Sequence, residues 1–143
     1  MGNDGGLLNW PPGSVFQEMT FLVLGSQGYI GRAVSKALLQ QGSEVIGLVR
    51  KTEGSTSMGV QEISFDLNRD DPKNLERLVG DSIIIDCAWS NGFLHNHETH
   101  ALQAANRLAF YDKISNFNPK KIVSLGSMHE LGSRSGPVSD VVV

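Results

Sequence analysis

The sequence predicts an α/β fold in which helices cover both faces of a parallel sheet. Short apolar segments alternate along the chain with segments that have helical character, an order typical of parallel sheets built from strand–helix–strand units. Most of these apolar segments are continuous, as in strands buried on both faces. At 143 residues and 40% hydrophobic content, the chain is long enough to bury one core, so we expect one domain.

The first expected unit joins two strands through one helix. The apolar strand Phe21–Leu24 precedes a helix that ends near Gly42, and Val45–Val49 follows as the second strand. One helix and a tight turn fit between the strands, which is the length of a right-handed crossover. The apolar stripe of this helix is expected at Ala33, Val34, Ala37 and Leu38.

The second half of the chain continues the alternation. A short helix is expected after Asp70 or Asp71, either of which caps it, with Pro72 near its first turn and Gly80 just past its end. The remaining expected strands are Gln61–Phe65, Ser82–Asp86 and Lys121–Leu125, and a long helix over residues 97–115 separates the last two. Together these elements predict a doubly wound parallel sheet with strand order 3-2-1-4-5 in three αβα layers.

Three glycines follow the first strand directly. Gly25 lets the chain turn sharply, Gly28 lets the backbone approach a diphosphate, and Gly31 lets the helix pack tightly on the strand. The helix N-terminus then offers free N–H groups to the phosphates. Glycines in ordinary turns are the alternative, but strand, glycines, helix and second strand in this order favour a Rossmann-type dinucleotide site. The expected binding residues of the loop are Gly25, Ser26, Gln27, Gly28, Tyr29, Ile30, Gly31 and Arg32.

Four motifs in order resemble a known family. They are Gly25–Gly31, Asp66-Leu67 after the third strand, Cys87–Trp89 after the fourth, and Ser124–Gly132 after the fifth. They look like the extended short-chain dehydrogenase/reductase family, and more narrowly its NAD-dependent epimerase/dehydratase branch, which acts on nucleotide sugars. The resemblance covers roughly residues 19–132.

The resemblance implies roles for five further residues. Asp66 and Leu67 would lie at the adenine ring. Ala88 and Trp89 would flank the ribose on the nicotinamide side, where the family usually has two small residues. Ser127 falls where the family places the hydroxyl that binds the reacting oxygen, although a turn residue at a strand end is the alternative interpretation of this serine.

The chain also departs from the family pattern. The dehydratase subgroup has an Asp-Glu pair after the hydroxyl residue, and this chain has Met128 and His129 there, so sugar dehydration by that pair is not expected. The family's base is the tyrosine of a Tyr-x-x-x-Lys motif, whose lysine lowers the tyrosine pKa. Neither Tyr29 nor Tyr111 is followed by lysine at that spacing. We therefore expect a cofactor-binding part that is truncated before the substrate domain.

The end of the second strand bears on the choice of cofactor. An NAD site has a carboxylate there that holds the ribose 2′-OH, but this chain has Val49 followed by Arg50 and Lys51. Cations at this point suit a 2′-phosphate, and Arg32 adds another. We therefore expect NADP as the cofactor. NAD stays open, because Arg50 and Lys51 could instead belong to a solvated turn that binds no phosphate.

Charge and cysteine content exclude several classes of protein. The net charge of −3 gives no basic footprint for nucleic acid, and no apolar run approaches the roughly 18 residues of a membrane span. A single cysteine, Cys87, allows no internal disulfide and fits the cytoplasm.

Residues 1–18 are expected to be a flexible leader and residues 19–143 the NAD(P)-binding domain. Lys121–Leu125 would be an unpaired edge, open to self-association.

Three histidines, His95, His97 and His100, precede the long helix. Neutral imidazoles bind zinc well, but the spacing from His97 to His100 is one residue short of the His-Glu-x-x-His motif. A polar loop and helix cap is the better interpretation, and no metal site is assigned.

Two classes of function stay open. One is the cofactor-binding part of an NADP- or NAD-dependent epimerase or reductase acting on a nucleotide sugar or a similar carbonyl or hydroxyl substrate. The other is a sensor or interaction module that binds the dinucleotide without turning it over. A flavodoxin-like domain is disfavoured by the glycine spacing and by Asp66-Leu67.

Overall fold

The computed structural model of the chain describes residues 19–52, 59–90 and 97–125. The expected leader, residues 1–18, lies outside them. The strands are β1 (Thr20–Leu24), β2 (Glu44–Val49), β3 (Gln61–Ser64), β4 (Ile83–Asp86) and β5 (Lys121–Ser124). The helices are α1 (Tyr29–Gln40), α2 (Glu76–Val79) and α3 (Thr99–Ser115), and the 3₁₀ turn η1 (Pro72–Leu75) precedes α2.

The five strands form one parallel sheet in the order β3-β2-β1-β4-β5, which confirms the predicted topology. β1 lies at the centre, where Leu22 pairs with Ile46 of β2 on one side and with Ile84 of β4 on the other. The chain leaves β1 toward β2 and later returns to the other side of β1 as β4. The carboxyl ends of β1 and β4 therefore form the crevice at which doubly wound folds bind ligands.

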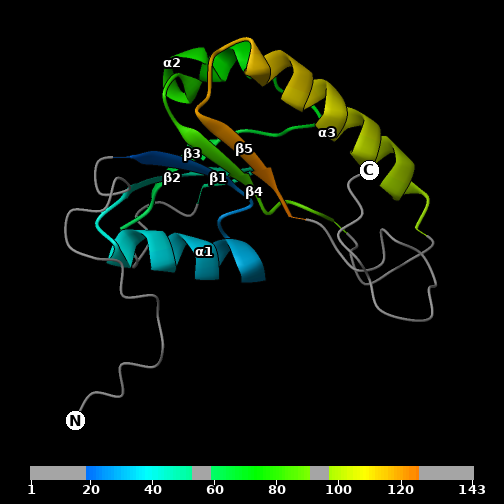
Figure 1. Cartoon of the computed structure of the whole chain (residues 1–143). Coiled ribbons are helices and arrows are strands. Elements are labelled where there is room, and N and C mark those ends of the chain that lie inside the picture. Colours follow the sequence, from blue (N-terminus) through cyan, green and yellow to red (C-terminus); the bar gives the residue numbers. More distant parts are fainter. Residues whose placement is uncertain (1–18, 53–58, 91–96, 126–143) are drawn as a thin grey trace, which may run out of the picture.

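Helices cover both faces of the sheet, as Figure 1 shows, with α1 on one face and α2 and α3 on the other. Successive residues of β1 point to opposite faces. Leu22 and Leu24 belong to a core cluster with Phe110 and Ile114 of α3, whereas Phe21 and Val23 belong to a second cluster. The second cluster includes Leu38 and Leu39 of α1. The three central strands are thus buried on both faces, as their continuous apolar sequences predict.

The start of α1 lies closer to the sheet than its apolar pattern predicts. The helix begins at Tyr29, so Gly31 lies within its first turn, and Gly31 and Ser35 are its buried residues. Ala33, expected on the inner stripe, is exposed, so that part of the prediction is wrong. A Cβ at Gly31 would lie 2.0 Å from the carbonyl oxygen of Gly25. With Gly31 this close to Gly25, Gly31 and Ser35 face the sheet and Ala33 faces outward.

The cap of the short helical segment is settled by its hydrogen bonds. The Asp71 carboxylate accepts from the backbone N–H of Lys73 at 3.0 Å, so Asp71 is the cap of η1. Asp70 instead accepts from the backbone N–H of Asp66 at 2.6 Å. Each of the two aspartates thus holds a different backbone group, and Asp70 fixes the turn that carries Asp66.

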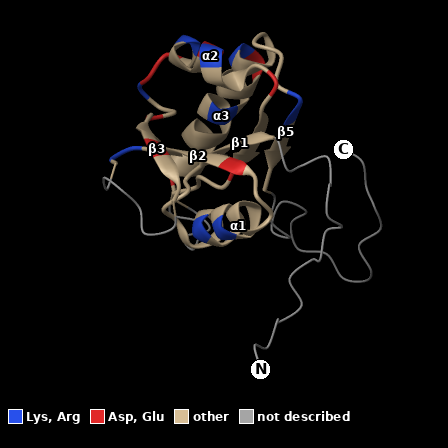
Figure 2. Ribbon diagram, turned by 90° about the vertical axis from the view of Figure 1, so that its left-hand side faces the viewer, with Lys and Arg blue, Asp and Glu red and all other residues tan. Residues whose placement is uncertain are grey.

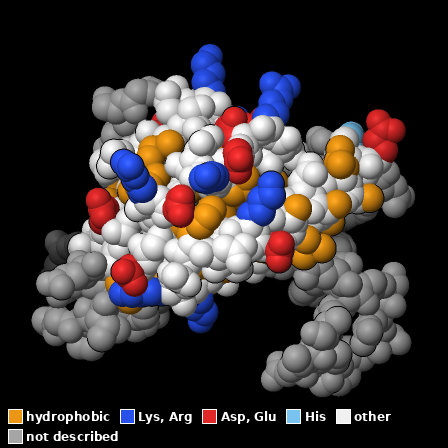
Figure 3. Space-filling model, turned by 90° about the horizontal axis from the view of Figure 1, so that it is seen from above, with side chains coloured by type: hydrophobic (Ala, Val, Ile, Leu, Met, Phe, Trp, Pro, Cys, Tyr) orange, Lys and Arg blue, Asp and Glu red, His pale blue; other side chains and the backbone are white. Residues whose placement is uncertain are grey.

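The outer face of α3 carries exposed apolar side chains. Leu102 and Leu108 are exposed, and hydrophobic side chains gather over one end of α3 in Figure 3. Within the described residues, β3 and β5 are the edges of the sheet, and self-association through the β5 edge stays a prediction. No described helix has the length and apolar character needed to cross a bilayer.

Candidate functional site

A cavity of about 680 Å³ opens at the carboxyl ends of the strands. Gly25 and Gly28 lie among its lining residues, which come from both sides of β1. One side is lined by residues that follow β2 and β3, and the other by residues that follow β4 and by side chains of α3. The polar and aromatic lining residues are Gln27, Arg50, Lys51, Phe65, Asp66, Asn68, Arg69, Trp89, Ser90, Gln103 and Arg107.

The glycine loop leaves room for a group above the start of α1. Gly25 has a φ of +71°, and a Cβ there would lie 2.9 Å from Cα of Ala88. Gly28 is the N-cap of α1, and among the described residues no side chain caps this helix. The first-turn N–H groups of a helix have no partner within it, so an anion at this point is their natural acceptor. The loop therefore fits a diphosphate.

The rest of the glycine segment contacts the protein more than the cavity. Ser26 is buried, and a Cβ at Gly47 would lie 2.2 Å from its Oγ, so Ser26 packs against β2. Tyr29 is 95% exposed, and Ile30 is also exposed. The residues of the segment that line the cavity are Gly25, Gln27 and Gly28, whereas Ser26, Tyr29, Ile30, Gly31 and Arg32 do not.

Gly47 is a residue that the sequence interpretation missed. A glycine inside an otherwise apolar strand often marks a close approach of other backbone, and that signal was present in Val45–Val49. Arg32 supports the same loop from outside, because its Nε donates to the carbonyl oxygen of Gln27 at 2.7 Å. Gly47 thus leaves room for Ser26, and Arg32 holds the backbone of Gln27.

The end of β2 gives the cavity a positively charged wall. Arg50 and Lys51 line it, as does Arg69 from the turn after β3, and basic positions directly after β2 are visible in Figure 2. Asp66 is the described carboxylate that lines the cavity, and its Oδ2 lies 3.8 Å from Nε of Arg69. Gln27 donates to the carbonyl oxygen of Lys51 at 3.0 Å. The wall therefore carries more cationic than anionic side chains. The glycine loop holds part of it in place, because Gln27 binds the backbone of Lys51.

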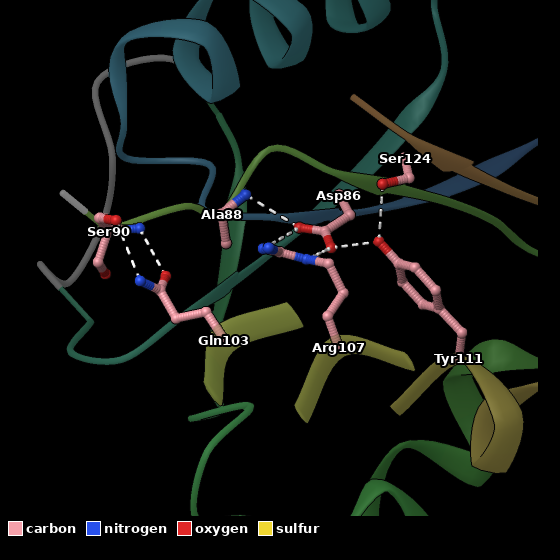
Figure 4. Close-up of polar contacts among 7 residues, drawn as sticks. All are labelled: Asp86, Ala88, Ser90, Gln103, Arg107, Tyr111 and Ser124. Atoms are coloured by element: carbon pink, nitrogen blue, oxygen red, sulfur yellow. Dashed lines mark hydrogen bonds and ion pairs between the residues drawn. The ribbon is translucent and has the colours of Figure 1, made fainter. Parts of the chain in front are cut away.

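Asp86 is the centre of a polar network where β4 ends (Figure 4). Its carboxylate accepts from Nε and Nη2 of Arg107, the latter at 3.1 Å, and from the hydroxyl of Tyr111 at 2.5 Å. The backbone N–H of Ala88 donates to it at 3.0 Å. The Asp86 side chain is 1% exposed and that of Arg107 12%. A buried carboxylate is tolerated when it is paired and hydrogen-bonded in this way.

Tyr111 is unsuited to act as a base. Burial and its hydrogen bond to Asp86 raise the pKa of Tyr111 to about 12, whereas a catalytic tyrosine needs a pKa near the working pH. Its hydroxyl also lies 3.0 Å from Oγ of Ser124, so it ties α3 to the ends of β4 and β5.

Trp89 and Gln103 complete the α3 side of the cavity. Trp89 is half-exposed, and its Nε1 donates to Nδ1 of His100 at 3.2 Å. The Gln103 amide donates to the carbonyl oxygen of Ser90 at 3.1 Å and accepts from its N–H at 3.0 Å, as Figure 4 shows. Gln103 and Arg107 were not predicted. Their four-residue spacing, continued by Tyr111, places them on one helix face and is the signal that was overlooked.

The histidines lie at the start of α3. His97 Nδ1 is 2.7 Å from the Thr99 hydroxyl, and His100 accepts from Trp89, while His95 lies outside the described residues. Among the described residues, no group of three or more His, Cys, Asp or Glu side chains is arranged to hold a metal ion. Both described histidines serve as hydrogen-bond partners in a polar loop and helix start.

Cys87 offers a direct test of the cavity environment. Burial and the charge of Asp86 raise the pKa of its thiol from 9.0 to about 11. Thiolate is the reactive form of cysteine. With a pKa two units higher, the folded chain at pH 8 holds about one hundredth as much thiolate as a thiol of pKa 9.0 would. We expect iodoacetamide to alkylate Cys87 on the order of a hundredfold more slowly than in the urea-unfolded chain, followed by mass spectrometry. Equal rates would show that the thiol is not shielded.

The predicted hydroxyl residue, Ser127, lies outside the described residues. The other residues named by the resemblance, Asp66, Leu67, Ala88 and Trp89, all line the cavity, and their contact with a cofactor stays a prediction.

Two bacterial sugar dehydrogenases are similar to part of this sequence. The dTDP-6-deoxy-L-talose 4-dehydrogenase (NAD(+)) of Aggregatibacter actinomycetemcomitans is 28% identical over 123 residues, which cover 84% of this chain and 46% of that protein. The corresponding NAD(P)(+) enzyme of Kitasatospora kifunensis is 29% identical over 114 residues, which cover 77% of this chain and 36% of that protein. The chain thus spans less than half the length of these relatives.

Solved structures and a family match agree with this likeness. UDP-glucose-4-epimerase from Stenotrophomonas maltophila, solved with bound NAD and formylated UDP-arabinopyranose, aligns with a TM-score of 0.68 at 18% identity, covering 85% of this chain and 41% of that one. At this identity the likeness concerns the fold. Residues 21–142 match the NAD dependent epimerase/dehydratase family. A match over that much of the chain shows that the protein belongs to the NAD-dependent epimerase/dehydratase family.

Proposed function

We propose that residues 19–143 form the dinucleotide-binding domain of an NADP- or NAD-dependent enzyme that acts on a nucleotide sugar or a related carbonyl or hydroxyl substrate. The observation that carries the proposal is the cavity at the carboxyl ends of the strands, with Gly25 and Gly28 between its two sides. The two sugar dehydrogenase relatives support the substrate class, because both act on a dTDP-linked deoxy sugar.

The lining residues suggest how a dinucleotide would lie. Its diphosphate would accept from the uncapped first turn of α1 above Gly28. Its adenosine half would extend toward Arg50 and Asp66, and its nicotinamide half toward Ala88 and Trp89. The dinucleotide would supply hydride transfer. The described residues would bind and orient it. Neither tyrosine of the chain is suited to act as the base, because Tyr29 is almost fully exposed and the pKa of Tyr111 is raised.

Titration calorimetry of the chain with NADP and with NAD tests the proposal. We expect saturable binding of at least one dinucleotide with a stoichiometry near one per chain. Failure of both dinucleotides to bind would overturn the proposed function.

We further propose that NADP is preferred over NAD. Arg50, Lys51 and Arg69 line the cavity where a ribose 2′-phosphate would lie, and Val49 stands where an NAD site has its carboxylate. Guanidinium groups bind phosphate through charge-assisted hydrogen bonds.

The substitution Arg50→Ala tests this preference. We expect NADP binding to weaken by about 1–3 kcal/mol, the scale of a hydrogen bond to a charged group, and NAD binding to stay nearly unchanged. Calorimetry with both dinucleotides measures the two changes. Arg77→Ala is the matched control, because Arg77 is exposed and does not line the cavity. An equal loss for NADP and NAD would show that Arg50 does not contact the 2′-phosphate.

A further inference from the structure

We propose that Trp89 is an aromatic platform on which the nicotinamide ring stacks, and that His100 and Arg107 are the positioning residues that hold it. The inference rests on the proposed function, because it concerns the same cavity. Trp89 lines this cavity with 46% of its surface exposed. A large aromatic ring left half-exposed in a cavity keeps surface free for a flat partner.

The indole ring is held on two sides by α3. Its Nε1–H donates to Nδ1 of His100 at 3.2 Å, and the two rings are inclined by only 23°. Cζ of Arg107 lies 4.6 Å from the centroid of the indole ring, a cation–π distance. Arg107 is itself fixed by its paired hydrogen bonds to the buried carboxylate of Asp86. Because the indole ring is already ordered, little side-chain entropy of Trp89 is lost when a ligand stacks on it.

The position of Trp89 selects the nicotinamide half of the dinucleotide. Trp89 follows Ala88, whose Cα would lie 2.9 Å from a Cβ on Gly25, so Trp89 is next to the glycine loop. It follows β4, on the opposite side of β1 from β2 and Arg50. The cationic side near Arg50 suits the phosphorylated adenosine half, which leaves the nicotinamide half for Trp89. Nicotinamide is flat, and its oxidised form is a cation, which tryptophan faces attract.

Tryptophan fluorescence gives a direct test. The chain has two tryptophans, so the Trp10→Phe variant reports on Trp89 alone. This variant is titrated with NADP and with 2′-phospho-ADP-ribose, and with NAD and ADP-ribose as a second pair. The two members of each pair differ only in the nicotinamide. We expect NADP or NAD to quench the emission strongly, and the analogue that lacks nicotinamide to bind with little quenching.

Affinity measurements give a second test. Trp89→Ala should weaken NADP binding by roughly three- to tenfold, the range for an aromatic pair, without changing the affinity for 2′-phospho-ADP-ribose. Trp89→Phe should recover most of the loss, because it keeps an aromatic face. His100→Ala should show a smaller, equally selective loss, because it frees the indole ring. Arg107 is left intact, since its removal would leave Asp86 buried without its cation.

The outcomes separate this inference from the proposed function. If none of the four ligands binds, both are overturned. If the dinucleotides bind but quench no more than their analogues, or if Trp89→Ala weakens both kinds of ligand equally, the platform alone is overturned. Quenching by a nucleotide sugar such as dTDP-glucose, but not by the dinucleotides, would assign Trp89 to the substrate and also overturn it.

Discussion

The Gly28→Val chain is expected to fold as the original chain does and to bind dinucleotides about a hundredfold more weakly or worse. Gly28 has a φ of −72° and a ψ of 170°, which valine adopts without strain. A Cβ there would lie 3.3 Å from the carbonyl oxygen of Gly25, so a small shift accommodates it. The two further methyl groups would occupy the space above the first turn of α1, where the diphosphate is proposed to lie.

Calorimetry measures the affinity in this experiment, and circular dichroism measures the fold. Gly80→Val is the matched control, because a Cβ at Gly80 would make only an ordinary contact, 3.7 Å from the carbonyl oxygen of Phe117, and Gly80 does not line the cavity. Unchanged affinity in the Gly28 variant would show that the diphosphate does not lie above this turn.

The strand order and layers were predictable because their signals are local. Glycines, an aspartate cap and continuous apolar segments each report on a few neighbouring residues, and the observed strands begin or end within one residue of the expected ranges. The orientation of α1 was less predictable. It depends on how closely Gly31 approaches Gly25, and this contact turns Ala33 outward despite its apolar character.

The candidate site was predicted in part. The glycine motif predicted Gly25, Gln27 and Gly28, and the place of Arg50 at the end of the second strand predicted that residue. Asp66 and Leu67 were expected from the family resemblance. On the other side, Ala88 and Trp89 were expected from the family resemblance, whereas Gln103 and Arg107 of α3 were not predicted, because the network joins residues far apart in sequence. Asp86 and Arg107 are separated by 21 positions, and only the rotation of α3 over β4 brings them together. Charged residues on a helix are usually solvated, so Arg107 by itself did not indicate a buried pair.

Arg107→Gln is expected to lower the free energy of unfolding by about 3–5 kcal/mol, because it leaves Asp86 as a buried charge without its cation. The Asp86 side chain is 1% exposed, so water cannot replace the lost hydrogen bonds. Urea denaturation measures the change. Arg69→Gln is the matched control, since the Arg69 side chain is 85% exposed in its pair with Asp66. Exposed pairs contribute at most about 1 kcal/mol.

A double variant separates the buried charge from lost packing. Asp86→Asn combined with Arg107→Gln removes both charges, while the asparagine oxygen still accepts from Tyr111 or from the N–H of Ala88, the partners that Asp86 has now. The double variant should therefore be more stable than Arg107→Gln alone. If Arg107→Gln costs no more than Arg69→Gln, the pair at the end of β4 is solvated and does not anchor α3. If the double variant is no more stable than the single one, the arginine acts through its packing on Trp89 and not through its charge.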